Sequence, residues 1–207
     1  MSKDSRRLVV DVDALVKLAH WGLLGELEAA TGIPPERQAT VESIRFRAIR
    51  RDSKLFRDAN VANDLAVALN QFSVGWFPDT DVVARLQGNA GLDAGEITLI
   101  AMLCSDPQAL LVTGDKRALR ALAEPGLEDI VERVAGRVLC LEQILLSALD
   151  RLGVGALANS IERHRDLDVA IRCAVPLPPY AVEIEVRRGL LSYIDDLRND
   201  APALLYE

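Results

Sequence analysis

The chain has 207 residues, of which half are hydrophobic and 27% are charged. This balance excludes an intrinsically disordered chain and fits one compact domain with a sizeable core and room for a small appendage. Acidic residues outnumber basic ones by 31 to 24, and the formal net charge of −7 argues against a protein that holds nucleic acid by general electrostatic attraction.

The N-terminal part opens with a short buried strand and continues as helices. Leu8-Val9-Val10 is an uninterrupted apolar run that Asp11 stops, which is typical of a buried strand. In chain order we predict a strand at 8–10, a helix at 14–30, two helices within 36–72 that meet near 51–53, a break at 75–78 and a short helix at 81–87.

The rest of the chain alternates short apolar runs with helices. We predict a helix at 93–104, a strand at 109–112, a helix at 116–123, a strand at 137–141 and a helix at 142–152. This alternation indicates an α/β fold with a central parallel sheet flanked by helices. After Gly153, two helices at 156–174 and 181–199 are separated by three prolines. We therefore expect one domain at 1–152 and a helical extension at 153–207 that packs on its core.

Neither a membrane span nor a sulfur or imidazole site is expected. No apolar run approaches the roughly 18 residues that a membrane span needs, and no signal-peptide pattern precedes Asp11, so we expect a soluble cytoplasmic protein. Three isolated cysteines lack metal-binding spacing and are interpreted as small buried hydrophobes. His20 and His164 stand alone, which disfavours a zinc site or a catalytic triad. The three cysteines are Cys104, Cys140 and Cys173.

Acidic residues stand where two predicted strands end and where one helix begins. Asp11 and Asp115 follow strands, and Asp93 and Glu96 open the helix between them. In an open α/β sheet, ligands bind outside the carboxyl ends of the strands. Carboxylates gathered there without His or Cys suit Mg²⁺ or Mn²⁺, which can activate water and neutralise phosphodiester charge. The alternative is that each acid only caps a helix.

Four segments carry a family resemblance across residues 8–142. They are Leu8-Val9-Val10-Asp11 with Ala14-Leu15, Ala39-Thr40-Val41-Glu42-Ser43, Leu92-Asp93-Ala94-Gly95-Glu96-Ile97-Thr98-Leu99-Ile100-Ala101, and Leu110-Leu111-Val112-Thr113-Gly114-Asp115-Lys116-Arg117-Ala118. In this order they resemble the first strand, an early helix, a Gly-Glu helix and a Thr-x-Asp strand of the PIN domain, a family of metal-dependent nucleases. The resemblance implies a three-layer PIN-like fold.

The resemblance also implies the site residues. Asp11, Glu96 and Asp115 would hold Mg²⁺ or Mn²⁺ and carry catalysis. Glu42 would be a further ligand and catalytic group, with Asp93 as an alternative ligand. Asp13 would either support these ligands or replace one of them, and Thr113 would position Asp115 or a water through its hydroxyl.

A basic stretch within this acidic chain is a candidate contact for nucleic acid. Arg47, Arg50, Arg51 and Lys54 follow i, i+3, i+4, i+7 spacing, which would place them on one helical face able to track a phosphate backbone. Lys116 would add to a second basic rim. The alternative is a solvated face. The two aromatic residues nearby would either stack on unpaired bases or lie in the core; they are Phe46 and Phe56.

Together these observations predict a divalent-metal-dependent endonuclease that hydrolyses phosphodiester bonds, with RNA as the expected substrate. The resemblance further implies the toxin component of a toxin–antitoxin or defence module, with an antitoxin-like protein partner. The helical extension at 153–207 is a candidate surface for a homodimer or for docking of a partner. One alternative is a non-catalytic nucleic-acid- or protein-binding module on the same fold. Another is a phosphatase of the haloacid-dehalogenase type, suggested by the Asp11-Val12-Asp13 motif at a strand end.

Overall fold

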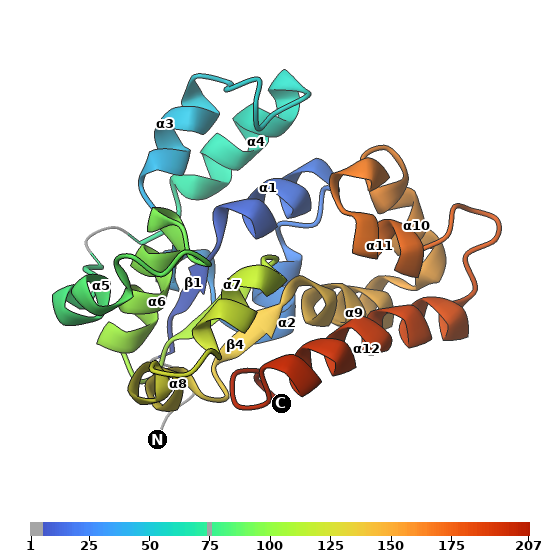
Figure 1. The fold of residues 1–207 in the computed structure, drawn as a ribbon. Helices are drawn as coiled ribbons and strands as arrows, with labels where there is room; N and C mark the ends of the chain where they lie inside the picture. The colour runs from blue at the N-terminus through green and yellow to red at the C-terminus, as the bar shows by residue number, and fades with distance from the viewer. Residues whose placement is uncertain (1–5, 74–75) are drawn as a thin grey trace.

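Figure 1 shows the computed structural model, which describes residues 6–73 and 76–207. Within these ranges, four parallel strands form a sheet in the order β2-β1-β3-β4, with helices on both sides. The strands are β1 (Leu8–Val10), β2 (Gln38–Ala39), β3 (Leu110–Thr113) and β4 (Val138–Cys140). The predicted α/β class with a central parallel sheet is therefore confirmed.

Helices account for most of the remaining chain. In chain order they are α1 (Val12–His20), α2 (Glu26–Thr31), α3 (Ser43–Ile49), α4 (Ala59–Leu69), α5 (Thr80–Leu86), α6 (Ala94–Ser105), α7 (Lys116–Leu122), α8 (Glu128–Val134), α9 (Leu141–Leu152), α10 (Val154–Glu162), α11 (Val169–Ala174) and α12 (Glu183–Asp200). Short 3-10 turns lie at Pro35–Arg37 and Arg165–Leu167.

Both faces of the sheet are buried, which explains why its strands are uninterrupted apolar runs. Leu8 and Val10 pack in a cluster with residues of α1, α2 and α9, whereas Val9 packs in a second cluster with residues of α6, α7 and α8. Successive strand side chains point to opposite faces, so each residue of β1 reaches one core or the other. Each fully buried side chain of this size contributes about 1.5–3 kcal/mol through burial.

Most of the predicted elements are confirmed to within a few residues, but two predicted helices are wrong in their middle. The helix predicted at 14–30 is divided into α1 and α2 because Gly22 adopts a φ of 68°, which ends the first helical run. The helix predicted at 156–174 is divided into α10, a 3-10 turn and α11. Asp168 restarts the helix there by accepting a hydrogen bond from the backbone N–H of Ile171.

Two elements were not predicted. Strand β2 has only two residues and begins with Gln38, whose buried side chain donates to the carbonyl of Ile33, so it lacks an apolar run. Helix α8 was also missed. The break predicted at 75–78 lies partly outside the described residues, and no helix includes Trp76.

Residues 153–207 contribute to the hydrophobic cores on both faces of the sheet. In Figure 1, α12 lies alongside α9. Its Val186 and Leu190 join one hydrophobic cluster, and its Ile194 and Leu197 join the other. Beyond α12 the backbone N–H of Tyr206 donates to the carbonyl of β4 residue 138 at 2.7 Å. None of the helices in the described ranges is long and apolar enough to cross a membrane.

The two histidines and one cysteine differ from their sequence-based interpretation. His20 and His164 are far apart in sequence, but their rings pack edge to face with centroids 4.9 Å apart. His20 is buried and also stacks on Phe56. Two of the cysteines are buried as expected, whereas Cys173 is exposed. The histidine contact joins α1 to the segment that follows α10.

Helix α3 ends earlier than the basic stretch does. Arg51 adopts a left-handed φ of 52°, and its N–H donates to the carbonyl of Ala48 at 3.0 Å. The N–H of Asp52 donates to the carbonyl of Arg47, also at 3.0 Å. These two bonds form a Schellman motif, which usually places glycine where Arg51 stands. The helix therefore stops at the cost of a strained arginine.

Replacing Arg51 with glycine should relieve this strain. We expect Arg51→Gly to raise the free energy of unfolding by about 0.5–1 kcal/mol. Glycine adopts a positive φ without steric strain, and the strain removed should exceed the cost of the extra chain entropy of glycine in the unfolded state. Arg50→Gly is the matched control, since Arg50 has a right-handed φ of −78°. This variant should lower the free energy of unfolding by about 0.5–1 kcal/mol. Chemical denaturation of both variants measures the difference. Equal destabilisation of both would contradict the strain at residue 51.

Candidate active site

Four of the five predicted ligands line one hollow of about 310 Å³. It lies where β1 and β3 end, at the edge expected for a ligand site in a parallel sheet. We call it the acid hollow; its polar lining includes Asp11, Asp13, Arg47, Asp93, Glu96 and Asp115. The fold therefore brings together carboxylates that are more than 100 residues apart in the chain.

Asp11 is the most buried of these acids, with an exposed fraction of 8%. It follows β1 directly, and its backbone N–H extends the sheet by donating to the carbonyl of Val112 at 2.9 Å. The hydroxyl of Thr113 donates to its Oδ2 at 3.2 Å. Burial, together with the nearby carboxylate of Asp13, raises the pKa of Asp11 to about 6 despite that hydrogen bond.

Asp93 and Glu96 form a capping box at the start of α6. The Asp93 carboxylate accepts the N–H of Glu96 at 2.8 Å, and the Glu96 carboxylate accepts the N–H of Asp93 at 2.7 Å. Helix capping is therefore part of what these acids do. Burial and the negative charges of Asp93 and Asp115 also raise the pKa of Glu96 to about 7, so its carboxyl is crowded by other acids.

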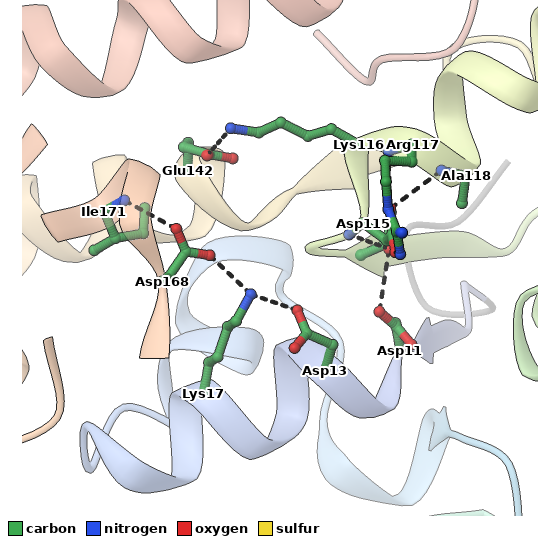
Figure 2. A network of polar contacts seen from close by, with 11 residues as sticks. Asp11, Asp13, Lys17, Asp115, Lys116, Arg117, Ala118, Glu142, Asp168 and Ile171 are labelled. Carbon is green, nitrogen blue, oxygen red and sulfur yellow. Dashed lines mark hydrogen bonds and ion pairs between the residues drawn. The ribbon is translucent and has the colours of Figure 1, made fainter. Parts of the chain in front are cut away.

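Asp115 follows β3 and caps α7 by accepting the N–H groups of Arg117 and Ala118. Its second oxygen pairs with the exposed Arg117 guanidinium at 2.8 Å, as seen in Figure 2. Burial alone would raise the pKa of Asp115, but these hydrogen bonds outweigh it and lower the pKa. The Thr113 hydroxyl also accepts the N–H of Asp115 at 3.0 Å, so Thr113 links Asp11 with Asp115.

Asp13 lines the acid hollow but is committed to an ion pair. Its carboxylate contacts Lys17 at 2.5 Å, and Lys17 also contacts Asp168 at 2.8 Å (Figure 2). Gly114 leaves room for it, because a Cβ there would lie 2.8 Å from the nearer oxygen of Asp13. Asp13 therefore connects the hollow to the C-terminal segment.

Glu42 is not brought into the acid hollow. It stands at the N-cap of α3, is exposed, and lines a neighbouring hollow instead. The sequence pattern could not reveal this, because the position of Glu42 depends on how the segment after β2 packs against α6. The other four predicted ligands all line the acid hollow.

The predicted basic face is only partly realised. Arg47 lines the acid hollow and pairs with Asp52 at 2.8 Å. Arg50, Arg51 and Lys54 are exposed but lie at or beyond the end of α3, so the prediction of a single helical face is wrong. The left-handed residue 51 is the physical reason, because it turns the chain away from the helix axis.

The remaining candidate contacts divide between surface and interior. Lys116 pairs with the buried Glu142 at 2.5 Å (Figure 2). Its ammonium also lies 4.3 Å from the centre of the Tyr193 ring. Lys116 is therefore a structural link between α7, α9 and α12 rather than part of a free basic rim. Phe56 lies in the core, whereas Phe46 is 60% exposed on α3.

The donor set of the acid hollow matches Mg²⁺ or Mn²⁺, because every candidate ligand supplies carboxylate oxygens. Burial raises the pKa values of Asp11 and Glu96, and neighbouring carboxylates in the hollow raise them further. Within residues 6–73 and 76–207, however, no three His, Cys, Asp or Glu side chains already form a metal-binding group. Binding would require these side chains to move together and Arg117 to release Asp115.

Comparisons with known proteins add no relative. No family model matches the chain, and neither the curated proteins nor the solved structures compared with it give a match. The PIN-like topology therefore stays a prediction that rests on the four sequence segments.

Replacing Asp11 should stabilise the metal-free protein. Its pKa of about 6 is some two units above the unfolded value of 3.8, so ionisation costs the folded state stability between about pH 4 and 6, and the loss persists above that range. We expect Asp11→Asn to raise the free energy of unfolding at pH 8 by about 1–3 kcal/mol and to change it little at pH 4. Denaturation in EDTA measures this.

Asp64→Asn on the exposed side of α4 is the control for Asp11→Asn. It should leave stability nearly unchanged at both pH values. If Asp11→Asn destabilised the protein equally at pH 4 and pH 8, ionisation of a buried Asp11 would not be what lowers the stability of the folded protein.

Proposed function

We propose that this chain is a divalent-metal-dependent endonuclease that hydrolyses phosphodiester bonds in RNA. One observation carries the proposal: the carboxyl groups of Asp11, Asp93, Glu96 and Asp115, which come from three separate segments, line one hollow at the end of a parallel sheet. The order and spacing of the four segments that resemble PIN domains support the same activity.

The residues of the hollow have distinct roles in this proposal. Asp11, Glu96 and Asp115 would hold Mg²⁺ or Mn²⁺, with Asp93 close by. When bound, such an ion supplies water activation and charge neutralisation at the phosphodiester. The Thr113 hydroxyl orients the Asp11 carboxyl group by donating to it, and it fixes the backbone of Asp115 by accepting its N–H. Arg47 is the basic side chain in the lining and is suited to contact a phosphate of the strand.

The α3–α4 hairpin would hold the strand beside the hollow. In Figure 1 it projects beyond the rest of the molecule, and Arg50, Arg51 and Lys54 are exposed on it. These side chains lie where a phosphate backbone can reach them, although they do not share one helix face. These basic side chains give an acidic protein a local positive surface that can attract the phosphate backbone.

One observation favours a non-catalytic binding module instead. The exposed Arg117 pairs with Asp115, so a side-chain cation already neutralises one of the four acids. A phosphatase of the haloacid-dehalogenase type has less support, because Asp13 of the Asp11-Val12-Asp13 motif is engaged by Lys17. An antitoxin-like partner and a toxin or defence role remain predictions of the family resemblance, and a homodimer remains a prediction from the helical C-terminal segment. Since α12 supplies buried residues to both cores, dimerisation is best tested by measuring the mass of the whole chain rather than of a truncated one.

Cleavage of single-stranded RNA tests the proposal directly. We expect cleavage with Mn²⁺, none with EDTA, and a loss of at least about 100-fold in Asp115→Asn, because Asn loses the ligand charge. Asn also caps helices well, so α7 should be preserved. Asp64→Asn is the control and should cleave normally. Unchanged cleavage by Asp115→Asn would refute the assigned site, and no cleavage with any metal would favour the binding module.

Removing Arg117 separates the nuclease from the binding module without measuring activity. If Arg117 competes with the metal for Asp115, Arg117→Ala should tighten Mn²⁺ binding by no more than about fivefold, since exposed ion pairs are weak. Arg120→Ala, on the same helix but paired with Asp200, should have no effect. Isothermal titration calorimetry measures both. Absence of Mn²⁺ binding in both variants would show that the hollow is not a metal site.

A further inference from the structure

A second hollow, of about 510 Å³, adjoins the acid hollow. Val41, Ser43 and Gly95 line both hollows, so the two share a wall built from the segment after β2 and from α6. Gly95 has no side chain to obstruct that shared wall. We call this second space the Phe77 hollow; its lining includes Thr40, Glu42, Arg45, Trp76, Phe77 and Thr98.

The Phe77 hollow has one fixed aromatic ring and one free ring. The indole N–H of Trp76 donates to the Ser105 hydroxyl at 3.0 Å, and the Arg7 guanidinium lies 5.3 Å from the centre of its ring. Trp76 also packs against the second core cluster, so it is held in place. Phe77 follows directly and is 78% exposed. A firmly anchored neighbour thus presents an aromatic ring to solvent at the rim of a hollow.

The polar lining of the Phe77 hollow can accept hydrogen bonds. Glu42 contributes an exposed carboxylate, and the Thr40 hydroxyl is buried with no hydrogen-bond partner among the described residues. The Arg45 guanidinium is held by the carbonyl of Phe72 at 3.1 Å. An aromatic ring beside a carboxylate matches a nucleobase, whose flat face stacks on the ring and whose amino group donates to the acid.

We propose that the Phe77 hollow holds one unpaired base of the strand whose phosphodiester lies in the acid hollow. This inference rests on the proposed function and makes its substrate more specific. A base can enter the hollow only when it is unstacked and unpaired, so the substrate is single-stranded or looped RNA rather than a duplex. Stacking on Phe77 positions the strand, and Glu42 contacts the base instead of the metal.

The test measures binding separately from cleavage. The probe is a single-stranded ribo-oligonucleotide of about eight nucleotides with 2-aminopurine at its centre, a length within the range of known single-strand sites. It is titrated with the full chain carrying Asp115→Asn, so that the RNA stays intact. Stacking on Phe77 should quench the 2-aminopurine fluorescence. The same sequence as a duplex serves as the second probe.

We expect Phe77→Ala to weaken single-strand binding roughly tenfold and to abolish the quenching, because it removes the stacking ring. Phe77→Trp should restore both. Tyr180→Ala is the matched control, since Tyr180 is also 78% exposed and lines neither hollow. Duplex binding should be weaker than single-strand binding and unchanged by Phe77→Ala.

Two results distinguish the inference from the proposed function. If the native chain cleaves RNA with Mn²⁺ but Phe77→Ala binds and quenches as well as its parent, the inference alone is wrong. If the native chain neither binds nor cleaves any of the probes, the proposed function fails and the inference fails with it. Equal loss of binding in Phe77→Ala and Tyr180→Ala would also overturn the role of the Phe77 hollow.

Discussion

The parallel pairing of β1 with β3 is the constraint on which the candidate site depends. Val10 pairs with Val112, so the segments that follow β1 and β3 leave the sheet at the same level and in the same direction. Asp11 then bonds to the carbonyl of residue 112, and Thr113 bonds to both Asp11 and Asp115. A one-residue slip would turn every strand side chain to the opposite face and separate these acids.

This constraint also explains the electrostatic character of the hollow. The strands end in acids at the same edge, and α6 begins there with a capping box, so acidic side chains outnumber basic ones in the lining of the hollow. Burial, and secondly this crowding of acids, raises the pKa values of Asp11 and Glu96. The net charge of −7 first argued against a nucleic-acid enzyme. Part of this charge is concentrated in one hollow, where a divalent cation would offset it.

The C-terminal segment supports the site from behind. Asp168 joins Lys17 and Asp13 in an ion-pair chain that reaches the acid hollow, as Figure 2 shows. Lys116, next to Asp115, is anchored by Glu142 of α9 and covered by the ring of Tyr193 from α12. The two contacts connect the residues beside the acids to the helices that complete the core. A change in the packing of α12 should therefore alter the positions of the side chains beside Asp115.

The sequence by itself determined the features that arise from local patterns. Uninterrupted apolar runs marked β1 and β3, because a strand buried on both faces needs no polar residue. The acids that follow these strands or open α6 were visible because capping residues occur at fixed positions next to such elements. Four of the five predicted ligands accordingly line the acid hollow.

Only the tertiary structure decided the features that depend on contacts between distant segments. Glu42 faces a neighbouring hollow, and Lys116 is drawn into an ion pair with Glu142, because packing against α6 and α9 places them there. Arg51 breaks the basic face by a backbone angle that its residue type does not announce. Helical spacing predicts neighbours only while the helix continues, and carboxylates meet only where the sheet register brings their strands together.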